Sequence, residues 1–196
     1  MHSAIVESCP IYDVGFMLDE SGSVSRTNWR KEEVFTNQIA KMANIAPTGG
    51  RASVITFHSS ANLDIKFNRN TNYDAFARDV DNLNQNRGGT NIIRALRMGL
   101  DHMFQTRNGM RQDSSKIAIL ITDGQDSNRA SSYSSIAADY KRRNIRLIVI
   151  GVGSVSRSKL ERLVQNQKED LFISGSFNTL LQTFVKSVGQ TICTGK

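Results

Sequence analysis

The fold is decided by residues 11–23, IYDVGFMLDESGS, in which an apolar segment ends in a run of oxygen-bearing side chains. Residues 11–18 are strand-like, and Asp19, Ser21 and Ser23 follow at every second position. In an extended or gently turning backbone, residues two apart project to the same side. One carboxylate and two hydroxyls can therefore converge on one point, and such hard oxygens suit Mg²⁺ or Mn²⁺ better than a softer metal. The stretch predicts a metal cradle at a strand end.

Strand-like and helix-like segments alternate along the rest of the chain. The apolar run 117–122, IAILIT, predicts a central strand covered on both faces, and 145–150, IRLIVI, predicts a second buried strand. Residues 52–57 and 63–67 predict a hairpin, and 171–174 a short strand. Apolar residues at helical spacing predict helices over 28–42, 73–83, 91–104, 132–143, 157–164 and 177–192.

This alternation predicts a doubly wound α/β fold. We expect a mostly parallel central sheet with one antiparallel edge strand and amphipathic helices on both faces. In such a fold the ligand site lies beyond the carboxyl ends of the strands. The cradle that follows residues 11–18 is predicted to lie at that end.

The length of 196 residues and the hydrophobic content of 39% fit a single globular domain. The two cysteines, Cys9 and Cys193, bracket nearly the whole chain and suggest a terminal clasp, the alternative being two unrelated thiols. We predict one domain over residues 9–193, with expression or linker residues 1–8 before it and a tail of residues 194–196 after it. A disulfide would place the domain in an oxidising compartment. No apolar run approaches the roughly 20 residues that cross a bilayer, so no membrane insertion is expected.

The formal net charge of +7 favours an acidic partner, such as a sulfated glycan, an anionic protein surface or nucleic acid. One cluster of basic residues forms a candidate polyanion patch, consisting of Lys141, Arg142, Arg143 and Arg146. Solvated helix faces show the same pattern, so both interpretations stay open. The aromatic residues fall on strands and helix stripes rather than beside exposed basic residues, which disfavours nucleic-acid binding.

Two further loops carry candidate ligands for the metal cradle. Thr90 closes the turn Gly88-Gly89-Thr90, and Asp123 directly follows the strand IAILIT. Both are expected at the pole of the sheet that holds the cradle. The complete candidate metal site therefore consists of Asp19, Ser21, Ser23, Thr90 and Asp123.

The order, spacing and strand context of these residues resemble the metal-ion-dependent adhesion site (MIDAS) of the von Willebrand factor type A family. The resemblance runs from VGFMLDESGSVS through GGTN and IAILITDG to the closing helix and its cysteine. It points to the extracellular-matrix branch, which includes matrilins, collagen VI, von Willebrand factor and mussel thread matrix proteins. By this resemblance Ser21 and Ser23 would bind Mg²⁺ or Mn²⁺ through their hydroxyls, Thr90 directly or through water, and Asp19 and Asp123 mainly through water. A partner's Glu or Asp carboxylate would complete the octahedron.

The resemblance implies an extracellular adhesion module, secreted into the matrix or part of a cell-surface ectodomain. Its expected partner is a matrix protein, with collagen as the leading candidate and glycosaminoglycan as an alternative. The stretches 123–132 and 150–157 leave little room for the extra helix that collagen-binding integrin domains carry near the metal. Binding through an acidic residue on the metal and binding through a metal-independent face are therefore both open.

An enzyme is disfavoured because the chain lacks the sequence elements of the common enzymes of this fold class. It contains neither G-x-x-x-x-G-K-[ST] nor G-x-S-x-G, and Gly151-Val152-Gly153 lacks the third glycine of a dinucleotide fingerprint. A metal-assisted hydrolase would need a general base, and neither His58 nor His102 is a convincing one.

Overall fold

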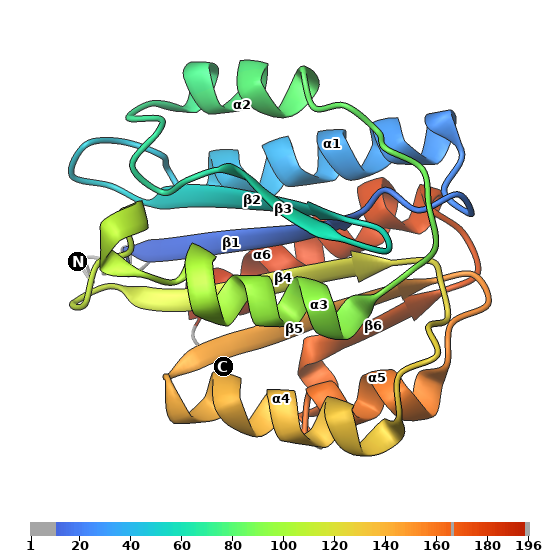
Figure 1. Cartoon of the computed structure of the whole chain (residues 1–196). Coiled ribbons are helices and arrows are strands. Elements are labelled where there is room, and N and C mark those ends of the chain that lie inside the picture. Colours follow the sequence, from blue (N-terminus) through green and yellow to red (C-terminus); the bar gives the residue numbers. More distant parts are fainter. Residues whose placement is uncertain (1–10, 166, 195–196) are drawn as a thin grey trace, which may run out of the picture.

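A computed structural model describes residues 11–165 and 167–194, and it shows a sheet between two layers of helices (Figure 1). The side chains of residues 191–194 are not described. Cys9 and the side chain of Cys193 therefore lie outside the described part. The predicted clasp between them stays a prediction, and so do the predicted domain bounds.

The central sheet has six strands in the order β3-β2-β1-β4-β5-β6. Neighbouring strands pair in parallel, except that β2 and β3 are antiparallel and β3 forms one edge. This confirms the predicted parallel sheet with one antiparallel edge strand. The strands are β1 (Tyr12–Asp19), β2 (Arg51–Phe57), β3 (Ala61–Ile65), β4 (Ser115–Thr122), β5 (Ile145–Val152) and β6 (Leu171–Ser174).

Helices cover both faces of the sheet, with α1, α2 and α6 on one face and α3, α4 and α5 on the other (Figure 1). Two predicted helices are each divided, because α3 continues into a π-helical turn, Gly99–Met103, and α6 follows another, Leu180–Phe184. The helices are α1 (Arg26–Met42), α2 (Tyr73–Asp81), α3 (Ile92–Met98), α4 (Ala130–Arg142), α5 (Arg157–Leu163) and α6 (Val185–Thr194).

The two central strands are buried on both faces. All eight residues of β1 are buried, as are the last six of β4. Phe16 belongs to the core under α1, whereas Met17, the next residue, belongs to the core under α3 and α4. Side chains alternate between the faces of a strand, so a continuous apolar run fills both cores. This explains why IAILIT correctly predicted a central strand.

The strand order reverses between β1 and β4, which are neighbours at the centre of the sheet. From β1 the chain proceeds to β2 and β3 on one side, and from β4 to β5 and β6 on the other. The loops after β1 and β4 therefore diverge at their carboxyl ends, where open α/β sheets bind ligands. Asp19 ends β1 and Asp123 follows β4. Because β1 and β4 are parallel neighbours, these two residues lie close together at the same edge of the sheet.

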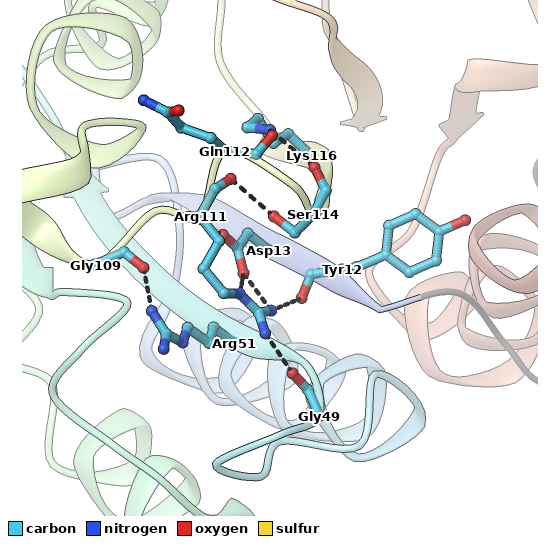
Figure 2. Close-up of polar contacts among 9 residues, drawn as sticks. All are labelled: Tyr12, Asp13, Gly49, Arg51, Gly109, Arg111, Gln112, Ser114 and Lys116. Carbon is cyan, nitrogen blue, oxygen red and sulfur yellow. Dashed lines mark hydrogen bonds and ion pairs between the residues drawn. The ribbon is translucent and has the colours of Figure 1, made fainter.

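The opposite pole of the sheet is closed by a buried ion pair (Figure 2). The Arg111 guanidinium donates to the carboxylate of Asp13, with Nη2–Oδ1 at 2.6 Å, and also to the carbonyl oxygens of Gly49 and Tyr12. Asp13 also accepts from the backbone N–H of Arg111, at 2.6 Å. This arrangement ties β1 to the segments that precede β2 and β4.

Candidate metal centre

Three of the predicted ligands meet in a chain of short contacts. The hydroxyls of Ser21 and Ser23 lie 2.9 Å apart, and the Ser23 hydroxyl donates to Oδ1 of Asp123 at 2.6 Å. Ser21 is buried, Asp123 is half-buried and Ser23 is exposed. The group therefore extends from the interior to the surface, and a ligand from outside can reach its outer side.

Asp19 accepts hydrogen bonds from the loop after β1 and from the last residue of β4. Its Oδ1 accepts from the backbone N–H of Ser21 at 3.0 Å, and its Oδ2 accepts from the hydroxyl of Thr122 at 2.6 Å. Burial raises the pKa of Asp19, the charge of Asp123 raises it further, and the hydrogen bonds from Ser21 and Thr122 oppose the rise. The sequence analysis did not assign Thr122 a role. A polar residue that ends an otherwise apolar strand was the available signal.

Thr90 lies next to the other predicted ligands because its side chain packs closely against Gly124, the residue after Asp123. A Cβ on Gly124 would lie 2.7 Å from the Thr90 hydroxyl oxygen, so a side chain there would occupy the space of Thr90. The loop that carries Thr90 is also bonded to the cradle, because the N–H of Gly22 donates to the carbonyl of Gly88 at 2.9 Å. The five predicted residues thus come from the last residue of β1 and from three loops that touch one another.

The buried side chain of Asp126 connects the loops that carry Thr90 and Asp123 through hydrogen bonds. The sequence analysis did not identify this residue. Its side chain is 1% exposed. The carboxylate accepts from the N–H of Ile92 at 3.0 Å and from the hydroxyl of Tyr133 at 2.8 Å, while Nζ of Lys159 lies 3.6 Å away. Because Ile92 follows Thr90 by two residues and Asp126 follows Asp123 by three, these bonds fix the two ligand loops relative to each other.

Glu32 of α1 adds an unexpected third carboxylate near the site. It is 0% exposed, and neither carboxylate oxygen makes a hydrogen bond of good geometry with a described residue, although the backbone of Asp19 is close enough to oppose the rise of its pKa. Burial raises the pKa of Glu32 well above its ordinary value, and the charges of Asp19 and Asp123 raise it further. Its position three residues after Trp29, on the buried side of α1, was the signal in the sequence.

This donor set fits a hard divalent cation. It combines hydroxyls with buried carboxylates whose mutual repulsion a cation would relieve. In the described part of the chain, no group of three or more His, Cys, Asp or Glu side chains is arranged to hold a metal ion. A site at Ser21 and Ser23 would therefore depend mainly on hydroxyl oxygens, which Mg²⁺ and Mn²⁺ accept more readily than soft metals do.

The candidate polyanion patch is largely engaged in internal contacts. Arg142 pairs with Asp139, Arg143 donates to the carbonyl of Leu100 at 2.6 Å, and Arg146 pairs with the buried Asp170 at 2.7 Å. Lys141 is exposed. These contacts give Arg142, Arg143 and Arg146 internal partners, while Lys141, Arg142 and Arg143 all remain exposed, so the patch stays a prediction.

A family comparison accounts for nearly the whole described domain. The model of the von Willebrand factor type A domain family matches residues 13–187. Integrin alpha-X of Mus musculus is 29% identical over 149 residues, which cover 75% of this chain and 13% of that protein. Matrilin-3 of Homo sapiens is 24% identical over 171 residues, which cover 86% of this chain and 34% of that protein. The collagen alpha-1(XII) chain of Notophthalmus viridescens is 24% identical, with 92% of this chain and 19% of that protein covered.

The chain thus spans about a third or less of each of these relatives. They are named as integrin, matrilin and collagen proteins, which agrees with the predicted binding module rather than an enzyme. The extracellular location predicted from the sequence agrees with them as well. No helix within residues 11–165 and 167–194 is long and apolar enough to cross a membrane.

Solved structures confirm the fold. Proximal thread matrix protein 1 from the mussel byssus superimposes with a TM-score of 0.86 at 22% identity, covering 94% of this chain and 48% of that one. A further structure of that protein has a zinc-occupied MIDAS motif and also gives a TM-score of 0.86.

Proposed function

We propose that this chain, which belongs to the von Willebrand factor type A domain family, is an adhesion module of the extracellular matrix. In this proposal it holds a divalent cation and presents it to a carboxylate of a matrix protein. The metal ligands would be Asp19, Ser21, Ser23, Thr90 and Asp123. Ser21 and Ser23 would bind through their hydroxyls, and the two aspartates mainly through water.

The contact chain from Ser21 through Ser23 to Asp123 is the observation that carries the proposal. It combines neutral hydroxyls with few carboxylates on the exposed side of the site. A cation ligated mainly by neutral oxygens keeps much of its positive field, so a partner's carboxylate becomes a strong ligand. Mg²⁺ and Mn²⁺ are the proposed metals on the grounds of ligand hardness. The zinc in the mussel protein's site makes Zn²⁺ the necessary comparison.

Collagen is the proposed partner, and its mode of binding is the point to test. Only residues 123–129 separate β4 from α4, and only residues 153–156 separate β5 from α5. Neither loop contains a helix. A collagen could therefore approach the metal without an intervening helix, or it could bind a face that needs no metal.

A binding panel with collagens and glycosaminoglycans tests this function. Wild type and Ser21→Ala would be compared with added Mg²⁺, Mn²⁺ or Zn²⁺ and with EDTA. We expect collagen binding that needs Mg²⁺ or Mn²⁺ and is lost in Ser21→Ala. Collagen binding that survives both EDTA and Ser21→Ala would reject the metal-bridged mode and keep the adhesion role. Binding to glycosaminoglycan alone would reject the collagen assignment.

The proposed domain closure by a Cys9–Cys193 disulfide needs its own test. In the loop-entropy model such a bond restricts the unfolded chain, and it is expected in an oxidising compartment. Mass spectrometry of the non-reduced, protease-digested protein should reveal a peptide pair joined through Cys9 and Cys193. Two alkylated thiols would reject the closure without affecting the proposed metal site.

A further inference from the structure

The pole that carries the candidate metal site turns its acidic side chains inward. Asp19 accepts from Ser21 and Thr122, and Asp123 accepts from Ser23. In the loops after the carboxyl ends of the strands, the remaining acidic residues are Glu20 and Asp126. Glu20 is 0% exposed and accepts a hydrogen bond from the backbone N–H of Asn86. The carboxylate of Asp126 accepts one from the backbone N–H of Ile92. These loops, all within the described part, therefore present no exposed carboxylate.

Three exposed arginines lie at the same pole. Arg26, Arg87 and Arg129 are exposed, and their guanidiniums have no ion pair or hydrogen bond with any residue that the structure describes. This contrasts with Arg111 and Arg146, which pair with buried aspartates elsewhere in the fold. Since the three guanidiniums have no internal role, we name Arg26, Arg87 and Arg129 the arginine rim.

Backbone contacts hold the rim next to the cradle. Arg87 lies between Asn86, whose N–H donates to Glu20 at 2.5 Å, and Gly88, whose carbonyl accepts from Gly22 at 2.9 Å. Asn128, which precedes Arg129, donates to the side chain of Asn91 beside Thr90, at 3.0 Å. Arg26 opens α1 three residues after Ser23. Each arginine is thus separated by one to three positions in the sequence from a metal-site residue, or from a residue that is hydrogen-bonded to the metal-site loops.

We propose that this pole binds an acidic protein segment, in which one carboxylate reaches the cation and neighbouring carboxylates pair with Arg87 and Arg129. This inference rests on the proposed function, and it adds the kind of sequence that the partner must offer. Guanidinium groups match carboxylates with two parallel hydrogen bonds. A single isolated carboxylate would occupy the cation and leave the rim without a counter-charge. Three arginines grouped around the metal site suit a short acidic segment. A long sulfated chain would need an extended row of basic groups instead.

Two short peptides test the inference directly. One has a single glutamate in a neutral sequence, and the other has three consecutive glutamates at the same place. Binding of both would be measured with Mg²⁺ by fluorescence anisotropy, for wild type and for the double variant Arg87→Gln, Arg129→Gln. The control is Lys66→Gln, Lys168→Gln, which removes the same number of charges from exposed positions away from the site.

We expect wild type to prefer the triglutamate peptide by roughly two- to thirty-fold, which corresponds to two exposed ion pairs. The rim variant should lose this preference, and the control should keep it. Added salt should reduce the preference because exposed charges are screened over about 8 Å at physiological ionic strength. A preference that persists in the rim variant would overturn the inference, as would equal Mg²⁺-dependent binding of the two peptides to wild type.

A different result would show that the proposed metal-dependent function is wrong. In that case Ser21→Ala and EDTA would leave peptide binding unchanged, whatever the rim variant does. A heparin oligosaccharide that binds wild type more tightly than the triglutamate peptide, and loses affinity in the rim variant, would assign the rim to a sulfated glycan and overturn the acidic protein segment.

Discussion

The hydroxyl of Ser23 donates a hydrogen bond of 2.6 Å to the carboxylate of Asp123, one hundred positions later in the chain. The contact joins the loop after β1 to the loop after β4, and both loops are fixed by buried strands. Two proposed ligands are therefore already adjacent on rigid supports. Such preorganisation reduces the conformational entropy lost when a ligand is bound.

Removing the Asp123 carboxylate should abolish the metal response of the domain. A cation that binds only the folded state raises stability by about 2.7 kcal/mol when its concentration is one hundred times Kd. We expect the melting temperature of wild type to rise with Mg²⁺ or Mn²⁺, and that of Asp123→Asn to stay constant. Differential scanning calorimetry with EDTA as the reference measures both. An equal rise in the two proteins would remove Asp123 from the metal site.

Gly124→Ala should weaken metal binding without a large loss of stability. Its new methyl group would lie 2.7 Å from the Thr90 hydroxyl oxygen, so Thr90 must move away from the site. The matched control is Gly175→Ala, at the same pole, where a Cβ has no neighbour within 4 Å. Isothermal titration with Mn²⁺ should show weaker binding for Gly124→Ala only. Unchanged affinity in Gly124→Ala would exclude Thr90 as a ligand.

Glu32→Met should stabilise the metal-free domain at neutral pH. The pKa of Glu32 in the folded protein is raised above the ordinary value of 4.5, so wild type loses stability as the pH rises from 4.5 through the raised pKa. Replacing this unpaired buried carboxylate by an apolar side chain of similar size should gain about 1–3 kcal/mol. The gain should be largest above the raised pKa and disappear below pH 4.5.

Chemical denaturation in EDTA across this pH range tests the expectation. Glu32→Gln is the control, because it removes the titration but keeps a polar group in the interior. Its stability should change less with pH than that of wild type, because only the contribution of Glu32 is removed. A Glu32→Met variant that is less stable than wild type at neutral pH would show that the carboxylate has a stabilising partner.

Arg111→Met should destabilise the opposite pole strongly. Asp13 is 0% exposed and would lose the charged partner that binds it (Figure 2). Removing one partner of a buried ion pair typically costs about 3–5 kcal/mol. The double variant Asp13→Asn, Arg111→Met should recover part of the loss because no buried charge remains unpaired. As a control, Arg97→Met breaks an exposed pair with Asp139 and should cost less than about 1 kcal/mol. Equal losses for Arg111→Met and Arg97→Met in urea denaturation would contradict this account.

The sequence was sufficient to predict the layout of the fold because its signals are local. The run IAILIT is apolar at every position but the last, and such a run is typical of a short strand buried on both faces. The spacing of Asp19, Ser21 and Ser23 likewise indicated a cradle before any tertiary contact was known. The two π-helical turns were not predicted, since their helices keep ordinary apolar spacing.

The sequence by itself determined the order of strands and helices and the identity of five oxygen-bearing residues at strand or loop ends. Only the tertiary structure decided which groups meet, because contacts such as Ser23 with Asp123 depend on the reversal of strand order between β1 and β4. It also revealed the buried Glu32 and the linkage through Asp126. A carboxylate that looks solvated in a helical pattern becomes a buried charge only when the sheet packs against that side of the helix.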